Sequence, residues 1–165
     1  MNPISGRFFK STVLLCILCA FTLVPALRAA ESPADQVKAA GAIPLTTDLL
    51  DKMDKAIKGV TADDAAKAEL GAIGKDPSMT PESWAAAVSS KCPKAAAIFK
   101  SAGVTPDDFS KGIFAIMACA FSEDMAKSSD KTAAANAAFI VANKEKCDAV
   151  FGGFMMLGEP SAPTP

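Results

Sequence analysis

The sequence predicts an all-α protein, folded as an irregular antiparallel bundle of five or six helices. No segment of the sequence alternates apolar and polar residues over the length of a strand. Apolar residues recur instead at spacings of three and four, and alanine is frequent, which lets neighbouring helices approach closely. Two segments, 80–82 and 105–107, carry the same start signal: a capping threonine, a proline and an acid.

The N-terminal segment, residues 1–30, has the features of an export signal. Arg7 and Lys10 precede an uncharged run whose apolar core, Val13–Val24, is shorter than the about 20 residues of a membrane-spanning helix. The small residues Ala29 and Ala30 follow, and we expect cleavage there. The sequence therefore predicts a periplasmic or secreted protein with no membrane span after signal removal.

Three further segments are predicted after the signal. Residues 31–45 are small and polar and are interrupted by Pro33 and Gly41, so we expect a flexible lead-in. Residues 46–157 have the length and apolar content of one helical-bundle domain. Residues 158–165 are rich in proline, which predicts a disordered tail.

The first helix of the domain is predicted over residues 48–59. Thr46 or Thr47 can cap it, and its apolar residues share one face. A second, short helix begins at Thr61 with Asp64 in the manner of a capping box, and Gly71 with Gly74 ends it. Acid-to-base pairs four residues apart line the solvated face of the first helix, each contributing about 0.3 kcal/mol: Asp48/Lys52, Asp51/Lys55 and Asp54/Lys58.

The third and fourth helices are predicted on either side of Pro93. The third begins after Thr80 and breaks at Ser89-Ser90. The fourth runs over residues 94–102, and Gly103 can adopt the left-handed conformation that ends it. Their inward positions hold large and small residues: Trp84, Ala85, Val88, Ala95, Ile98, Phe99 and Ala102.

Two long helices back to back form the largest predicted part of the core. The first is expected from Pro106 to about residue 126, where charge returns. The second begins after Ser129 or Asp130 and reaches Gly152-Gly153. One side of the second helix carries a continuous set of core-facing residues: Asn136, Phe139, Ile140, Asn143, Cys147, Val150 and Phe151.

The candidate ligand-facing residues come from these helices. Two asparagines lie among core-facing positions, where they can satisfy a helix partner and fix packing, or line a ligand cavity. The single tryptophan can be the large core residue against which alanines pack, or a platform for ligand stacking. The residues predicted to face a ligand or a partner are Trp84, Asn136, Phe139, Asn143 and Cys147.

Three cysteines remain after signal removal, in a compartment that permits disulfides. If the fourth and fifth helices pair as a hairpin centred near residue 104, Cys92 lies about 4.5 Å along the axis from Cys119. The corresponding offset between Cys119 and Cys147 is about 13 Å, beyond the reach of a disulfide. We therefore expect Cys92–Cys119, with Cys92–Cys147 second. The alternative is that all three are reduced core residues.

Missing residue types exclude most catalytic chemistry. The chain contains no histidine, which removes histidine-dependent triads and imidazole metal sites. Its only Cys-x-x-Cys lies within the signal, and the methionines lack the close spacing of a copper site. All 18 acidic residues follow the signal, and the lysines are scattered among them, so we expect no nucleic-acid partner. The sequence predicts no cofactor and no enzyme.

Residues 93–147 resemble a group of small exported, alanine-rich, all-helical bacterial proteins without an assigned function. The resemblance rests on Gly103-Val104-Thr105-Pro106-x-x-Phe109, an alanine-rich helix, and Asn136-x-x-Phe139-x-x-x-Asn143. It implies a bacterial, exported, non-catalytic module and supplies no active-site residue.

Two function classes follow from the sequence. A hydrophobic content of 50% without a catalytic set of residues favours a binding module of the bacterial envelope, for an apolar small molecule or a partner protein. The alternative is a structural or stress-protective envelope protein that holds unfolded clients, as a chaperone does.

Overall fold

A computed structural model describes residues 33–73, 79–120 and 123–157. The chain divides into two units, Met1–Asp35 and Gln36–Pro165, and nearly all described residues belong to the second. The predicted signal, its cleavage point and the predicted C-terminal tail lie outside the described residues.

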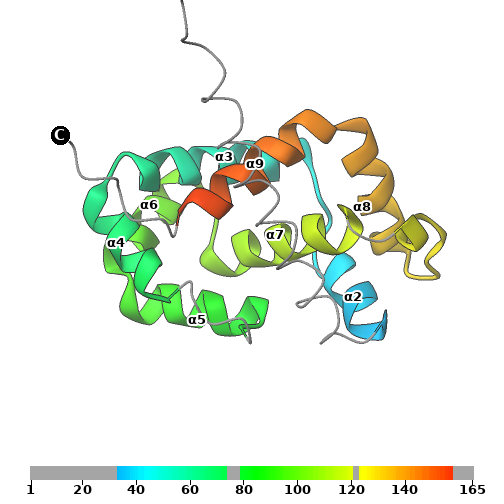
Figure 1. Cartoon of the computed structure of the whole chain (residues 1–165), viewed down its shortest axis with the longest axis horizontal. Coiled ribbons are helices and arrows are strands. Elements are labelled where there is room, and N and C mark those ends of the chain that lie inside the picture. The colour runs from blue at the N-terminus through cyan, green and yellow to red at the C-terminus, as the bar shows by residue number, and fades with distance from the viewer. Residues whose placement is uncertain (1–32, 74–78, 121–122, 158–165) are drawn as a thin grey trace, which may run out of the picture. The chain divides into compact units, whose positions relative to one another are not determined.

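The described residues confirm the all-α prediction, because they form helices and no strand. The described part of the chain contains eight α-helices and one 3-10 helix (Figure 1): α2 Pro33–Ala40, α3 Thr47–Thr61, α4 Asp64–Ile73, α5 Pro81–Lys91, α6 Pro93–Ala102, α7 Pro106–Ala120, η1 Glu123–Lys127, α8 Lys131–Ala142 and α9 Lys144–Met156.

The number of helices exceeds the predicted five or six for three reasons. The segment predicted as a flexible lead-in contains α2. The fifth predicted helix ends at Ala120, and a separate 3-10 helix follows it. The sixth is divided at Asn143, so that α8 and α9 replace one continuous helix. The glycine pair Gly152-Gly153 lies inside α9 and does not end it.

Local capping explains most of the helix starts. The Thr46 hydroxyl accepts a hydrogen bond from the Leu49 N–H at 3.1 Å, and Thr80 forms a capping box with Ser83. Asp63, in place of the predicted Thr61, caps α4, since its Oδ1 accepts from the N–H groups of Ala65 and Ala66, both at 3.0 Å. These bonds satisfy backbone donors that have no partner within the helix.

The start of α6 is capped from another helix. Cys92 precedes it without a capping side-chain bond. Instead, Oε2 of Glu69 in α4 accepts from the N–H groups of Lys94 at 3.0 Å and Ala95 at 3.2 Å. A carboxylate at this position also interacts favourably with the helix dipole, so Glu69 joins α4 to α6. At the other end, Gly103 takes the predicted left-handed conformation with φ of 82°.

Helix α3 holds α6 and α9 through polar as well as apolar contacts. The predicted pairs Asp48/Lys52 and Asp54/Lys58 both form at 2.6 Å. The third does not: Asp51 pairs with Lys146 of α9 at 2.5 Å, and Lys55 donates to the carbonyl of Ser101 in α6. Two predicted surface residues therefore make tertiary contacts.

A buried asparagine fastens the α2–α3 connection to α8. Asn136 is 2% exposed, and its Oδ1 accepts from the Leu45 N–H at 2.8 Å. Its Nδ2 donates to the carbonyls of Ala40 at 2.7 Å and Ile43 at 2.8 Å. One side chain thus satisfies three backbone groups that would otherwise be buried without partners. The segment expected to be flexible is held at residues 40–45 by this asparagine.

Replacing Asn136 by alanine should destabilise the protein by about 3 kcal/mol, because it leaves several buried backbone groups unsatisfied. The free energy of unfolding from urea titration measures this loss. Asn143→Ala, measured at a protein concentration where it is monomeric, is the matched control. That asparagine makes a bond within its own helix, and we expect a change below about 1 kcal/mol. Equal losses at the two positions would contradict the role assigned to Asn136.

Candidate functional site

The structure places the candidate Trp84 in the aromatic centre of the core. Trp84 is 7% exposed, and its ring stacks on Phe109 of α7, with centroids 5.7 Å apart and planes at 21°. It also forms T-shaped pairs with Phe99 of α6 and Phe154 of α9, each with ring centroids 6.1 Å apart. We call these four residues the aromatic cluster. Because its ring contacts three others, the tryptophan packs with the chain's own aromatic residues on several sides.

The two candidate asparagines serve different parts of the chain. The side-chain amide of Asn136 forms hydrogen bonds with the backbone at the α2–α3 connection. Asn143 is half-buried between α8 and α9, and its Nδ2 donates to the Phe139 carbonyl at 2.9 Å. Phe139 is half-buried and Cys147 is buried, and both pack in the main core with Trp84. Asn136 and Asn143 are thus engaged in separate backbone contacts.

The predicted Cys92–Cys119 disulfide is not present, and Cys92, Cys119 and Cys147 are free thiols. The prediction assumed that α6 and α7 pair as a hairpin, whereas α7 packs mainly along α5. Cys92 lies in the main core, with its thiol directed to the Glu69 carbonyl at 3.4 Å. Cys119 packs against a second cluster beside α8, formed by Ala40, Met125, Ala133 and Ala137.

Burial makes these thiols poor nucleophiles. It raises the pKa of Cys119 to about 11 from 9.0. It also raises the pKa values of Cys92 and Cys147, assisted by the nearby acids Glu69 and Asp148 respectively. Since the thiolate is the reactive form, the three groups behave as packed apolar side chains at neutral pH.

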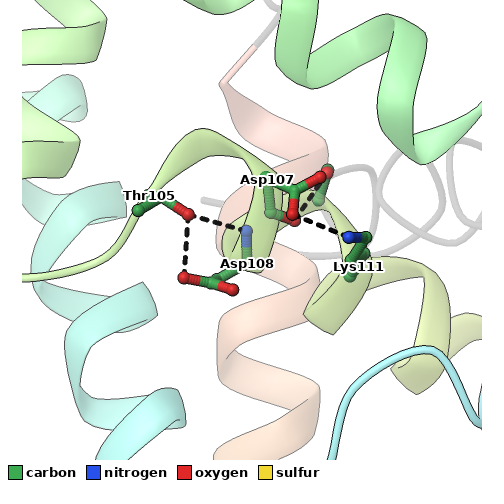
Figure 2. A network of polar contacts seen from close by, with 5 residues as sticks. Thr105, Asp107, Asp108 and Lys111 are labelled. Carbon is green, nitrogen blue, oxygen red and sulfur yellow. Dashed lines mark hydrogen bonds and ion pairs between the residues drawn. The ribbon is translucent and has the colours of Figure 1, made fainter.

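A network of polar contacts lies at the start of α7 (Figure 2). The Thr105 hydroxyl accepts from the Asp108 N–H at 3.0 Å and donates to the Asp108 carboxylate at 2.8 Å. Lys111 reaches Asp107 at 2.7 Å, and the hydrogen bond to Asp107 raises the pKa of Lys111. Capping and an ion pair one helical turn apart account for these residues.

Three structural features are absent from the described residues. Within ranges 33–73, 79–120 and 123–157, no group of three or more acids and cysteines is placed to hold a metal ion. No helix in those ranges is long and apolar enough to cross a membrane. Every buried side-chain nitrogen or oxygen there has a hydrogen-bond partner.

A further candidate site is the outer surface of α9. Met155 and Met156 are 57% and 60% exposed, and Gly152 and Ala149 precede them on the same side of the helix. A Cβ atom added at Gly152 would meet nothing within 4 Å. We call Ala149, Gly152, Met155 and Met156 the α9 surface. It presents two long apolar side chains beside two small residues.

The neighbouring glycine explains how this surface is oriented. A Cβ atom at Gly153 would lie 2.8 Å from Cγ2 of Ile57, so its absence lets α9 approach α3 closely. Gly153 therefore faces inward and Gly152 outward. Sequence reasoning missed the α9 surface, because it took the glycine pair as the end of the helix. The available signal was the spacing of three and four residues from Gly152 to the two methionines.

The raised pKa of Cys119 predicts that the folded protein loses stability in alkali. The folded-state pKa of Cys119 exceeds its unfolded value, so its contribution is complete below pH 9.0 and is lost as the pH rises towards about 11. Urea unfolding across this range should show a smaller decrease for Cys119→Ala than for the native chain. Lysine deprotonation affects both proteins equally. Identical decreases would contradict burial of this thiol.

No known family model matches the chain, and comparison with curated proteins and with solved structures finds no significant match.

Proposed function

We propose that the chain is an exported, non-catalytic binding module that docks a partner protein on the α9 surface. The observation that carries the proposal is the exposure of Met155 and Met156, 57% and 60%, side by side on the last helix. Methionine is flexible and polarizable, and it is used at protein surfaces that adapt to their partners. Exposed large apolar side chains that gather on one side of a surface helix are found at protein–protein contacts.

A small residue beside the methionines supports the proposal. Glycine inside a helix costs about 1 kcal/mol relative to alanine. Gly153 has a reason within the fold, since α3 packs against it. Gly152 faces open space, where a partner helix or strand could approach the backbone closely.

The interior gives less support to a small-molecule ligand. The aromatic rings pack on one another, with centroid separations from 4.7 to 6.1 Å. The buried polar atoms of the described ranges are satisfied within the chain. A partner that binds the outer side of α9 would leave both the aromatic rings and the buried polar atoms in their present contacts. The export signal predicted for residues 1–30 assigns the contact to the bacterial envelope or its exterior.

Changing both methionines to serine should weaken partner binding about tenfold or more, because the apolar area buried in the complex is lost. The immobilised mature chain would first recover partners from the exported fraction of its own host, and each would then be titrated by calorimetry. Val141→Ser is the matched control, since that side chain is 81% exposed but lies on α8. If the partner binds the double variant and the native chain with equal affinity, the proposal is wrong.

Two further measurements separate the alternatives. Suppression of client aggregation at stoichiometric ratios would favour the stress-protective function, because a specific binding surface should protect no unrelated protein. An apolar molecule retained in native mass spectrometry of protein from its own host would favour the small-molecule form of the binding module.

A further inference from the structure

We infer that Asn143 is a hinge at which α8 and α9 can join into one straight helix, allowing α9 to exchange between two copies of the chain. The two helices are separated by this residue alone, with φ of −123° and ψ of 31°. Its side chain provides no cap for α9 and bonds back to Phe139 instead. The break contains neither proline nor glycine, the usual causes of an interrupted helix.

The buried residues of α8 and α9 share one helical phase across the break. Asn136 of α8 and Cys147 of α9 lie about three helical turns apart, and Asn136 and Val150 about four. All three are buried. A straight helix over residues 131–156 would therefore keep one continuous buried face, over a length of roughly 39 Å. The pattern permits both the bent and the straight form.

The contacts of α8 would stay within one copy of the chain, whereas those of α9 could be exchanged between two copies. Helix α8 is tied to the α2–α3 connection by Asn136, and Asp130 caps its start through the Ala133 N–H at 2.8 Å. Helix α9 packs mainly on α3, with fewer contacts to α8 (Figure 1). Its contacts with α3 include the Lys146–Asp51 ion pair and the close approach at Gly153.

Exchange of α9 would preserve these contacts. In a dimer, α9 of one copy packs on α3 of the other, and the same apolar and ionic contacts form again between the copies. The net change is confined to the hinge, where two helix ends become helix interior in each copy. The occupant of the surface vacated on α3 is therefore a second copy of this chain.

The hinge can be tested with a matched pair of variants, Asn143→Ala and Asn143→Gly. Both remove the amide, and they differ in helix propensity. Because a dimer contains two hinges, we expect the dimerisation constant of the alanine variant to exceed that of the glycine variant by roughly 30-fold. Sedimentation equilibrium over a concentration series measures both constants. Equal constants, or an alanine variant that stays monomeric at about 1 mM, would overturn the inference.

Complementary charge reversals test the exchange itself with the native hinge. D51K alone and K146D alone each place like charges together within a monomer and within a homodimer. A swapped heterodimer of the two restores both ion pairs, so an equimolar mixture should contain more heterodimer than the half that random pairing gives. K144D mixed with D148K is the control, because that pair lies within α9. A heterodimer no more abundant than in the control mixture would also overturn the inference.

This outcome is distinguishable from failure of the proposed partner surface. The dimerisation constant of a dimer formed through Met155 and Met156 would fall when those residues are changed to serine. It would be the same for the Asn143→Ala and Asn143→Gly variants.

Discussion

The contact between Trp84 and Phe109 determines how most of the helices are arranged. The stacked pair joins α5 to α7, and Phe99 and Phe154 bring α6 and α9 to the same rings. Each aromatic pair contributes about 0.5–1.5 kcal/mol beyond its buried area. The four rings come from four different helices, so residues of any one helix could not form this contact by themselves. The short, alanine-rich helices depend on this shared centre for their positions.

The same arrangement determines which side of α9 faces outward. Phe154 directs one side of the helix towards the aromatic cluster, and Gly153 brings its backbone against Ile57 of α3. The methionines that follow are consequently placed outside the core. Elsewhere in the domain, Asn136 holds α2 and the start of α3 against α8. The proposed partner surface therefore lies on α9, and the proposed hinge lies directly before its first residue.

Sequence reasoning predicted the class of fold and most helix starts, because capping is local. Thr46, Thr80 and Gly103 act as expected within one turn of their own helices. Features that depend on distant residues could not be predicted. The partners of Asn136 lie more than ninety residues earlier in the chain, and Glu69 caps a helix in another part of it. The disulfide prediction was wrong because sequential helices were assumed to pair, whereas α7 lies mainly along α5.

We expect the aromatic cluster to hold the helices in one cooperative unit. The chain contains one tryptophan, so its fluorescence reports directly on the cluster, while far-UV circular dichroism reports on all helices. Urea unfolding of the mature protein should give coincident transitions by the two probes. A fluorescence change completed at a lower urea concentration than the loss of helical signal would show that the helices persist without the cluster, and would contradict the account.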